Sequence, residues 1–137
     1  MKESWTAPSV ATLHWDGKET PTLRDKYVKE ERLPILVGDS SNIKLLGAAK
    51  YPCGSGSDGR SGGLIAGKCI ELLEEWGCKD KIVSMCYDTT AANTGAMTAG
   101  CVSIQNEIGR ALLWCSCRHH VGEVILGGAF NALKIET

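Results

Sequence analysis

An acidic residue stands where an apolar run ends in the second half of this 137-residue chain. Residues 81–87 are almost continuously apolar, and Asp88 follows them directly, ahead of a stretch rich in Thr and Gly. An acid at the end of a buried strand is held rigidly, while the loop after it gives access to a ligand. This position is typical of a metal-binding or catalytic group. Asp is also a preferred residue at a helix N-cap, so Asp88 fits that role too.

A second group of chemically capable side chains follows at Cys115, Cys117, Arg118, His119 and His120. Thiols and imidazoles suit Zn²⁺, but no second paired-cysteine motif completes a closed structural site, so zinc is the minor interpretation. In the favoured interpretation, Cys117 is buried, and His120 packs or hydrogen-bonds close to the pocket that the carboxylates form. Arg118 and His119 are then free to meet a phosphate backbone.

Composition limits the class of protein. A hydrophobic fraction of 43% with 23% charged residues predicts a folded soluble domain, and a net charge of -1 gives no global basic field for nucleic acid. The seven cysteines are an odd number, and no signal peptide precedes them, which favours a reduced, intracellular protein. No apolar run approaches the roughly 20 residues that span a bilayer, so we expect no membrane role.

Hydrophobic periodicity and turn residues predict the elements that must position these groups. The predicted strands cover residues 9–16, 30–38, 42–49, 81–87 and 111–115, and the predicted helices cover residues 64–77, 91–108 and 121–133. A tight turn is expected at Asp16-Gly17, and a flexible loop over residues 51–63. Three strands followed by alternating helices and strands indicate one α/β domain over residues 1–137. Its mixed sheet has about five strands, a three-strand meander included, and flanking helices.

Two acids fall at comparable places in this order. Asp16 ends the first predicted strand and Asp88 ends the fourth, so their side chains emerge together if those strands are neighbours. This order resembles the ribonuclease H-like fold shared by DDE transposases and retroviral integrases, in which these two positions carry the first two metal-binding carboxylates. Asp-Gly is also a common tight-turn dipeptide, so the turn remains an alternative for Asp16.

The last third of the chain carries a more specific likeness. Cys117-Arg118-His119-His120 fits the C-x-x-H signature that follows the fifth strand in hAT-type transposases. The stretch 88–93, from Asp88 to Asn93, looks like their second-Asp motif. Residues 88–123 also look like a transposon-derived domain of animal proteins.

The resemblance implies a chemistry. Asp16 and Asp88 would bind Mg²⁺ or Mn²⁺, because these cations prefer hard oxygen ligands and can stabilise both the attacking and the leaving oxygen of a phosphodiester. The implied activity is that of a transposase or nuclease that cuts and joins DNA. The implied partner is DNA, and a transposase-derived protein would be nuclear.

The third acid of the family is the weak point of the likeness. In hAT-like enzymes it follows a long helical insertion, and this chain stops before one. Glu123 is the nearby acid on the helix after the fifth strand, where simpler transposases carry theirs, but it also fits a solvent-facing position. We therefore expect a fragment, truncated at its C-terminus and inactive alone. The alternatives are a non-enzymatic interaction domain of the same fold, which pairs with itself or with the rest of its parent, and a small Cys/His zinc domain.

Overall fold

The computed structural model describes residues 5–21, 29–51, 61–94 and 99–133. The strands are β1 Ala11–Trp15, β2 Lys18–Pro21, β3 Lys29–Gly38, β4 Ile43–Tyr51, β5 Ile82–Tyr87 and β6 Leu113–Ser116. The helices are α1 Ser61–Glu75, the short 3-10 helix η2 Lys79–Lys81, α2 Ala91–Thr94, α3 Gly100–Ile108 and α4 Arg118–Ala132.

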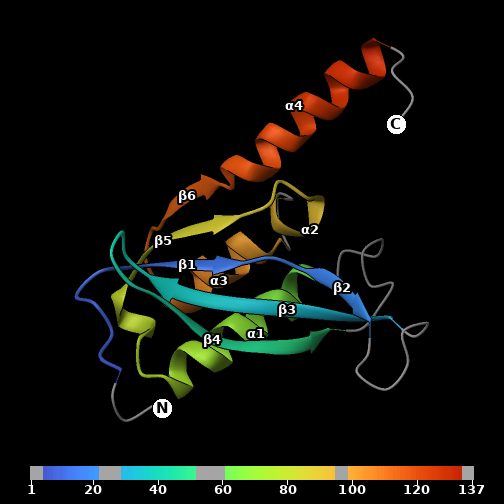
Figure 1. Cartoon of the computed structure of the whole chain (residues 1–137). Coiled ribbons are helices and arrows are strands. Elements are labelled where there is room, and N and C mark those ends of the chain that lie inside the picture. Colours follow the sequence, from blue (N-terminus) through green and yellow to red (C-terminus); the bar gives the residue numbers. More distant parts are fainter. Residues whose placement is uncertain (1–4, 22–28, 52–60, 95–98, 134–137) are drawn as a thin grey trace.

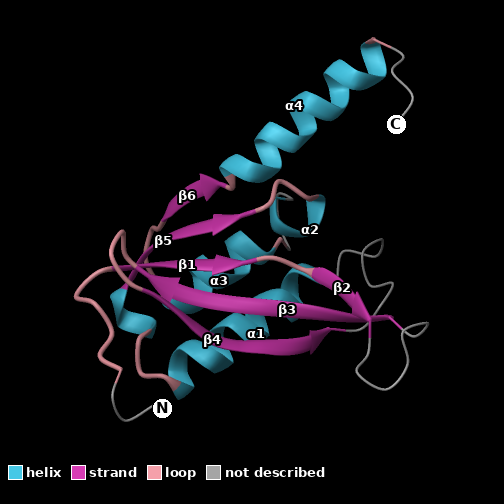
Figure 2. Cartoon of the chain, viewed as in Figure 1, coloured by secondary structure: helices cyan, strands magenta, loops and turns pink. Residues whose placement is uncertain are grey.

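The six strands of the described residues form one mixed sheet (Figures 1 and 2). The strand β3 pairs antiparallel with β4 on one side and with β1 and β2 on the other. Beyond β1 come β5 and then β6, both parallel to their neighbours. The strand order is therefore β4-β3-β1-β5-β6, with β2 beside the far end of β3. The predicted mixed α/β sheet with flanking helices is confirmed.

The tight turn expected at Asp16-Gly17 is wrong. Trp15 faces Ile35 and Lys18 faces Arg32, so β1 and β2 keep one register against β3 and the chain runs on without reversing. The 10-residue strand β3 is long enough to pair with both segments in succession. Asp16 and Gly17 therefore interrupt what is otherwise a single edge along β3.

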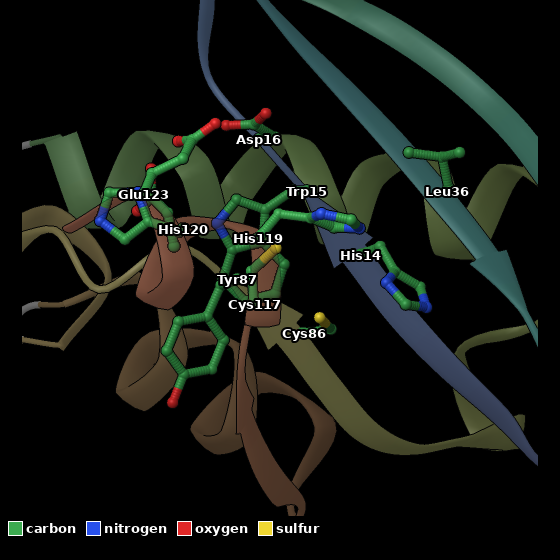
Figure 3. Close-up of a pocket in the computed structure, with 11 residues that line it drawn as sticks. His14, Trp15, Asp16, Leu36, Cys86, Tyr87, Cys117, His119, His120 and Glu123 are labelled. Carbon is green, nitrogen blue, oxygen red and sulfur yellow. The ribbon is translucent and has the colours of Figure 1, made fainter. Parts of the chain in front are cut away.

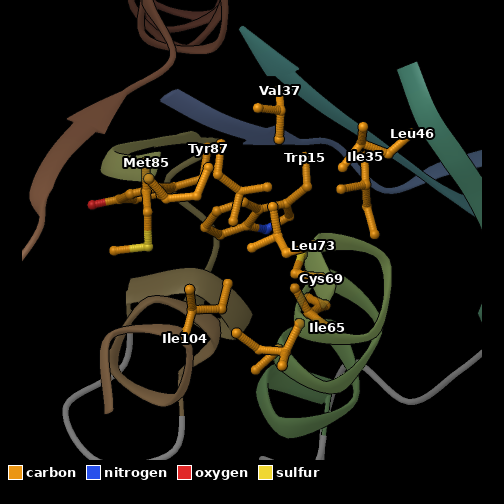
Figure 4. Close-up of a cluster of buried hydrophobic side chains, with 14 of the residues drawn as sticks. Trp15, Ile35, Val37, Leu46, Ile65, Cys69, Leu73, Met85, Tyr87 and Ile104 are labelled. Atoms are coloured by element: carbon orange, nitrogen blue, oxygen red, sulfur yellow. The ribbon is translucent and has the colours of Figure 1, made fainter. Parts of the chain in front are cut away.

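The core lies between the sheet and the helices α1 and α3 (Figure 4). Alternate residues of β1 are buried, as expected for a strand with one covered face. Leu13 and Ile35 from the sheet meet Leu73 of α1 and Ile104 of α3, and all four are fully buried. Burial of such side chains, each contributing about 1.5–3 kcal/mol, fixes the sheet against these two helices.

Several predicted boundaries move. The helix predicted over 91–108 appears as α2 and α3, and Ala99 between them has an extended backbone (φ -65, ψ 154), so one continuous helix is wrong. Glycine weakens helices, and the stretch contains Gly95 and Gly100. The helix α1 ends just before Gly77, whose φ of 64° makes it the predicted stop. Most of the predicted loop 51–63 lies outside the described residues, and α1 already includes residues 61–63.

The last helix starts earlier than predicted and leaves the body of the domain. α4 begins at Arg118 rather than at residue 121, so both histidines of the Cys/His cluster lie in its first turn. Figure 1 shows α4 projecting away from the sheet, and none of its residues is buried. In the described part of the chain, no helix has the length and apolar character needed to cross a membrane.

The turn between β3 and β4 generates a stability prediction. A Cβ at Gly38 would overlap the carbonyl oxygen of Asn42 and lie 2.6 Å from Cα of Ile43, so the backbone of the turn would have to shift. We expect Gly38→Ala to lower the free energy of unfolding by about 1–3 kcal/mol in urea denaturation. Gly63→Ala is the matched control, because a Cβ there meets nothing within 4 Å in helix α1. It should leave stability unchanged or raise it by up to about 1 kcal/mol; equal losses in both variants would contradict this reading of the turn.

Candidate functional site

The parallel pairing of β1 with β5 brings the two aspartates together. His14 faces Cys86 in this ladder, and two residues further along each strand come Asp16 and Asp88. Both side chains line one cavity of about 530 Å³ at the carboxyl ends of these strands. The two acids, far apart in sequence, therefore share one site, as the strand order predicted they would if β1 and β5 were neighbours.

The cavity also collects most of the other candidate residues (Figure 3). Its walls are formed by His14, Trp15, Asp16, Leu36, Cys86, Tyr87, Asp88, Cys117, His119, His120 and Glu123. Of the residues singled out in the sequence, Asn93, Cys115 and Arg118 are outside this lining. Asn93 is buried and hydrogen-bonded to Asp88, and Arg118 is exposed at the start of α4.

Asp88 is held by its neighbours through one carboxylate oxygen. Its Oδ1 accepts hydrogen bonds from Thr90 N at 3.2 Å, Thr90 Oγ1 at 2.7 Å and Asn93 Nδ2 at 2.6 Å. The backbone amide that it binds belongs to Thr90, before α2 begins. Asp88 therefore forms an Asx turn and does not bind an amide inside the helix. The described residues direct all of these bonds to Oδ1, which leaves Oδ2 for a ligand.

Asp16 and Glu123 approach the cavity from different elements. Asp16 is exposed at the interruption between β1 and β2, and Glu123 is exposed on α4. Figure 3 shows both carboxylates reaching toward the same part of the cavity. Glu123 is thus exposed, as its solvent-facing alternative expects, and it also lines the cavity.

Three thiols, those of Cys86, Cys115 and Cys117, lie on or next to β5 and β6, and two of them, Cys86 and Cys117, line the cavity. Cys86 faces Cys115 in the parallel ladder, and burial, reinforced by Cys117 and Cys115, raises the pKa of the Cys86 thiol. Cys117 is half-buried rather than buried as predicted, and Cys115 is exposed and does not line the cavity. Across the residues that the structure describes, no three His, Cys, Asp or Glu side chains are arranged to hold a metal ion together.

Five of the lining residues were not predicted from the sequence: His14, Trp15, Leu36, Cys86 and Tyr87. His14 alternates with the buried residues of β1, so it lies on the opposite face of the strand, and it lines the cavity. Trp15 directly precedes Asp16, is only 2% exposed, and donates its indole N–H to Asn93 Oδ1 at 2.8 Å. A buried tryptophan needs such an acceptor, but the sequence alone does not say which one it finds.

No family model, curated protein or solved structure matches this chain. The fold and the cavity define a mixed α/β domain with acids and imidazoles at the carboxyl ends of two parallel strands.

His14 gives the site a pH dependence. Burial lowers the pKa of this imidazole from its usual 6.5, so the unfolded chain takes up the proton at a higher pH than the folded chain does. The free energy of unfolding should therefore fall as the pH drops through 6.5 toward the folded pKa. In His14→Gln, the free energy of unfolding should decrease less over this pH range than in wild type. Urea denaturation between about pH 8 and about pH 5 measures the difference. His119→Gln, at an exposed position, is the control and should keep the wild-type profile; a His14→Gln profile parallel to wild type would contradict the assignment.

Proposed function

We propose that this chain is a ribonuclease H-like domain of the hAT-like transposase type, whose cavity binds a divalent cation and serves phosphoryl transfer on DNA within a longer parent. The observation that carries the proposal is the register of β1 against β5, which leaves Asp16 and Asp88 at adjacent strand ends of one cavity. Two carboxylates from different strands are a rigidly mounted pair of hard oxygen ligands.

The topology supports the fold assignment. The sheet order β4-β3-β1-β5-β6 places an antiparallel meander at one edge and two parallel strands, reached through helices, at the other. The resemblance leads us to expect this arrangement, including the first acid on the first strand and the second acid on the strand next to it. The topology and the positions of the two acids are thus both in agreement with the resemblance.

The donor set fits Mg²⁺ or Mn²⁺. Mg²⁺ commonly binds proteins through only one or two carboxylates and keeps several water ligands, so it does not need a preformed group of three side chains. Asp16 and Oδ2 of Asp88, which accepts no hydrogen bond from the described residues, supply such a pair, and Glu123 adds a third acid to the same lining. A cation held there would stabilise the charge that develops on the phosphate oxygens and would activate a water or hydroxyl nucleophile.

The remaining lining residues suit contact with a phosphate backbone. His119 and His120 lie in the first turn of α4 at the wall of the cavity, with Arg118 exposed beside them. Their N–H groups can donate to phosphate oxygens and so position a strand without reading its bases. Trp15 and Tyr87, whose rings stack on each other, add aromatic surface to the same lining.

A second function, an interaction domain without catalysis, has one observation in its favour. The helix α4 carries exposed apolar residues along its length: Val124, Ile125, Leu126, Phe130 and the adjoining Leu133. A helix that is apolar on several faces is usually covered by protein. In this alternative, the same cavity remains as an inherited feature and α4 meets the rest of the parent protein or a second copy.

Manganese binding tests the first proposal. Asp16→Asn and Asp88→Asn keep the size of the side chain but remove its charge, so each should weaken Mn²⁺ binding at least about tenfold in isothermal titration calorimetry. Asp80→Asn is the matched control, because Asp80 is an exposed acid outside the cavity. Its affinity should equal that of wild type. Wild-type affinity in Asp88→Asn would remove Asp88 from the metal site.

A strand-scission assay separates the enzyme from the interaction domain. We expect the isolated chain to bind Mn²⁺ and to hold DNA more tightly with the cation than without it at low salt, but not to nick supercoiled DNA. Nicking that Asp16→Asn abolishes would extend the proposal to catalysis by this chain alone. Nicking that survives Asp16→Asn would show that the activity does not use this cavity. DNA binding that does not respond to Mn²⁺ would favour the interaction domain.

A further inference from the structure

Asn93 is one of two polar side chains that are buried in the described part of the chain, the other being Ser84. Only 4% of Asn93 is exposed, and both ends of its amide are hydrogen-bonded. Trp15 Nε1 donates to Asn93 Oδ1 at 2.8 Å, and Asn93 Nδ2 donates to Asp88 Oδ1 at 2.6 Å. We call this chain of two bonds the Trp15–Asn93–Asp88 relay.

The chemistry of its two ends fixes the orientation of the amide. An indole N–H can only donate, and an ionised carboxylate can only accept. The carbonyl oxygen of Asn93 therefore has to face Trp15, and the NH₂ group has to face Asp88. A flipped amide would place two donors against each other and two acceptors against each other, so the relay permits a single arrangement.

Both ends of the relay are anchored in the sheet. Trp15 is 2% exposed and stacks on Tyr87, with ring centroids 5.4 Å apart and planes inclined by 23°. Trp15 directly precedes Asp16, and Tyr87 directly precedes Asp88. The ring pair that fixes the relay therefore also links the residues immediately before the two carboxylates.

A buried amide at this place is a poor choice for stability alone. Burying it costs free energy that its hydrogen bonds only recover, whereas an apolar side chain of similar size would carry no such cost. The amide gives something that an apolar residue cannot, a directed bond to one oxygen of Asp88. Groups that bind the outer side of a metal-ligating carboxylate orient it in this manner.

We propose that Asn93 is a positioning residue that holds Asp88 for cation binding, and that Trp15 fixes Asn93 in turn. The bond to Oδ1, together with those from Thr90, sets the rotation of the carboxylate so that Oδ2 is presented to the cavity. This inference rests on the proposed function, because it assigns a role at the same cation site. Neither residue touches the cation.

The test is the affinity of the full chain for Mn²⁺, measured by titration calorimetry for wild type and variants. Trp15→Phe removes the N–H donor but keeps an aromatic ring, and should weaken binding about tenfold. Trp114→Phe is the matched control, because Trp114 Nε1 makes an equivalent bond to an amide oxygen, Gln105 Oε1, at 3.0 Å, and Trp114 does not line the cavity. Its affinity should remain that of wild type.

A double variant distinguishes positioning from general damage to the structure. Asn93→Leu removes both bonds of the relay at similar volume and should weaken Mn²⁺ binding by at least as much as Trp15→Phe. Because Trp15 acts through Asn93, adding Trp15→Phe to Asn93→Leu should weaken binding no further. Losses that simply add would assign the two residues independent structural effects and overturn the relay.

The outcomes separate this inference from the proposed function. Wild type that does not bind Mn²⁺ overturns the proposed function itself. Wild type that binds Mn²⁺, together with folded Trp15→Phe and Asn93→Leu variants of equal affinity, overturns only the relay. If Trp15→Phe does not fold, as judged by circular dichroism, Asn93→Leu against the Trp114→Phe control decides the question.

Discussion

The site depends on one constraint, the parallel pairing of β1 with β5. Parallel neighbours end at the same edge of a sheet, so the residues that follow them meet there whatever their separation in sequence. The ladder that pairs His14 with Cys86 leaves Asp16 and Asp88 next to each other, and a slip of one residue would send one of them to the opposite face. The hydrophobic pattern of the two strands enforces the register, because a slip would also expose Leu13 or Met85.

The two faces of β1 have different surroundings. Leu13 and Trp15 point into the core that α1 and α3 cover, whereas Thr12 and His14 point to the other face, where Thr12 Oγ1 and Ser84 Oγ lie 2.6 Å apart. The relay crosses this division. Trp15 is a core residue by its burial. Its indole N–H nevertheless donates to Asn93, which in turn donates to the carboxylate of Asp88 in the cavity. Core packing and the orientation of a candidate metal ligand are thus linked in a single side chain.

The sequence was sufficient for the order of the five predicted strands and for the position of Asp88, because an apolar run that stops at an acid is a local signal, but it did not predict β2. It was insufficient where the structure depends on contacts that are remote in sequence. The Asp16-Gly17 dipeptide carries the local pattern of a tight turn, but pairing with the long strand β3 keeps the chain straight. The hydrogen bond from Trp15 to Asn93 joins residues 78 positions apart, and no periodic pattern in the sequence indicates it. Helix α4 was predicted, but its direction away from the body of the domain was not. None of its residues is buried, so its hydrophobic pattern does not mark one face that packs against the sheet.

The most direct test of the account is a crystal of this chain soaked in Mn²⁺ and measured for anomalous scattering. The account predicts an anomalous peak in the cavity, coordinated by carboxylate oxygens of both Asp16 and Asp88 at about 2–2.3 Å, with Asn93 still bonded to Oδ1 of Asp88. A peak held by the cysteines of β5 and β6, or an empty cavity at a saturating concentration of Mn²⁺, would contradict it.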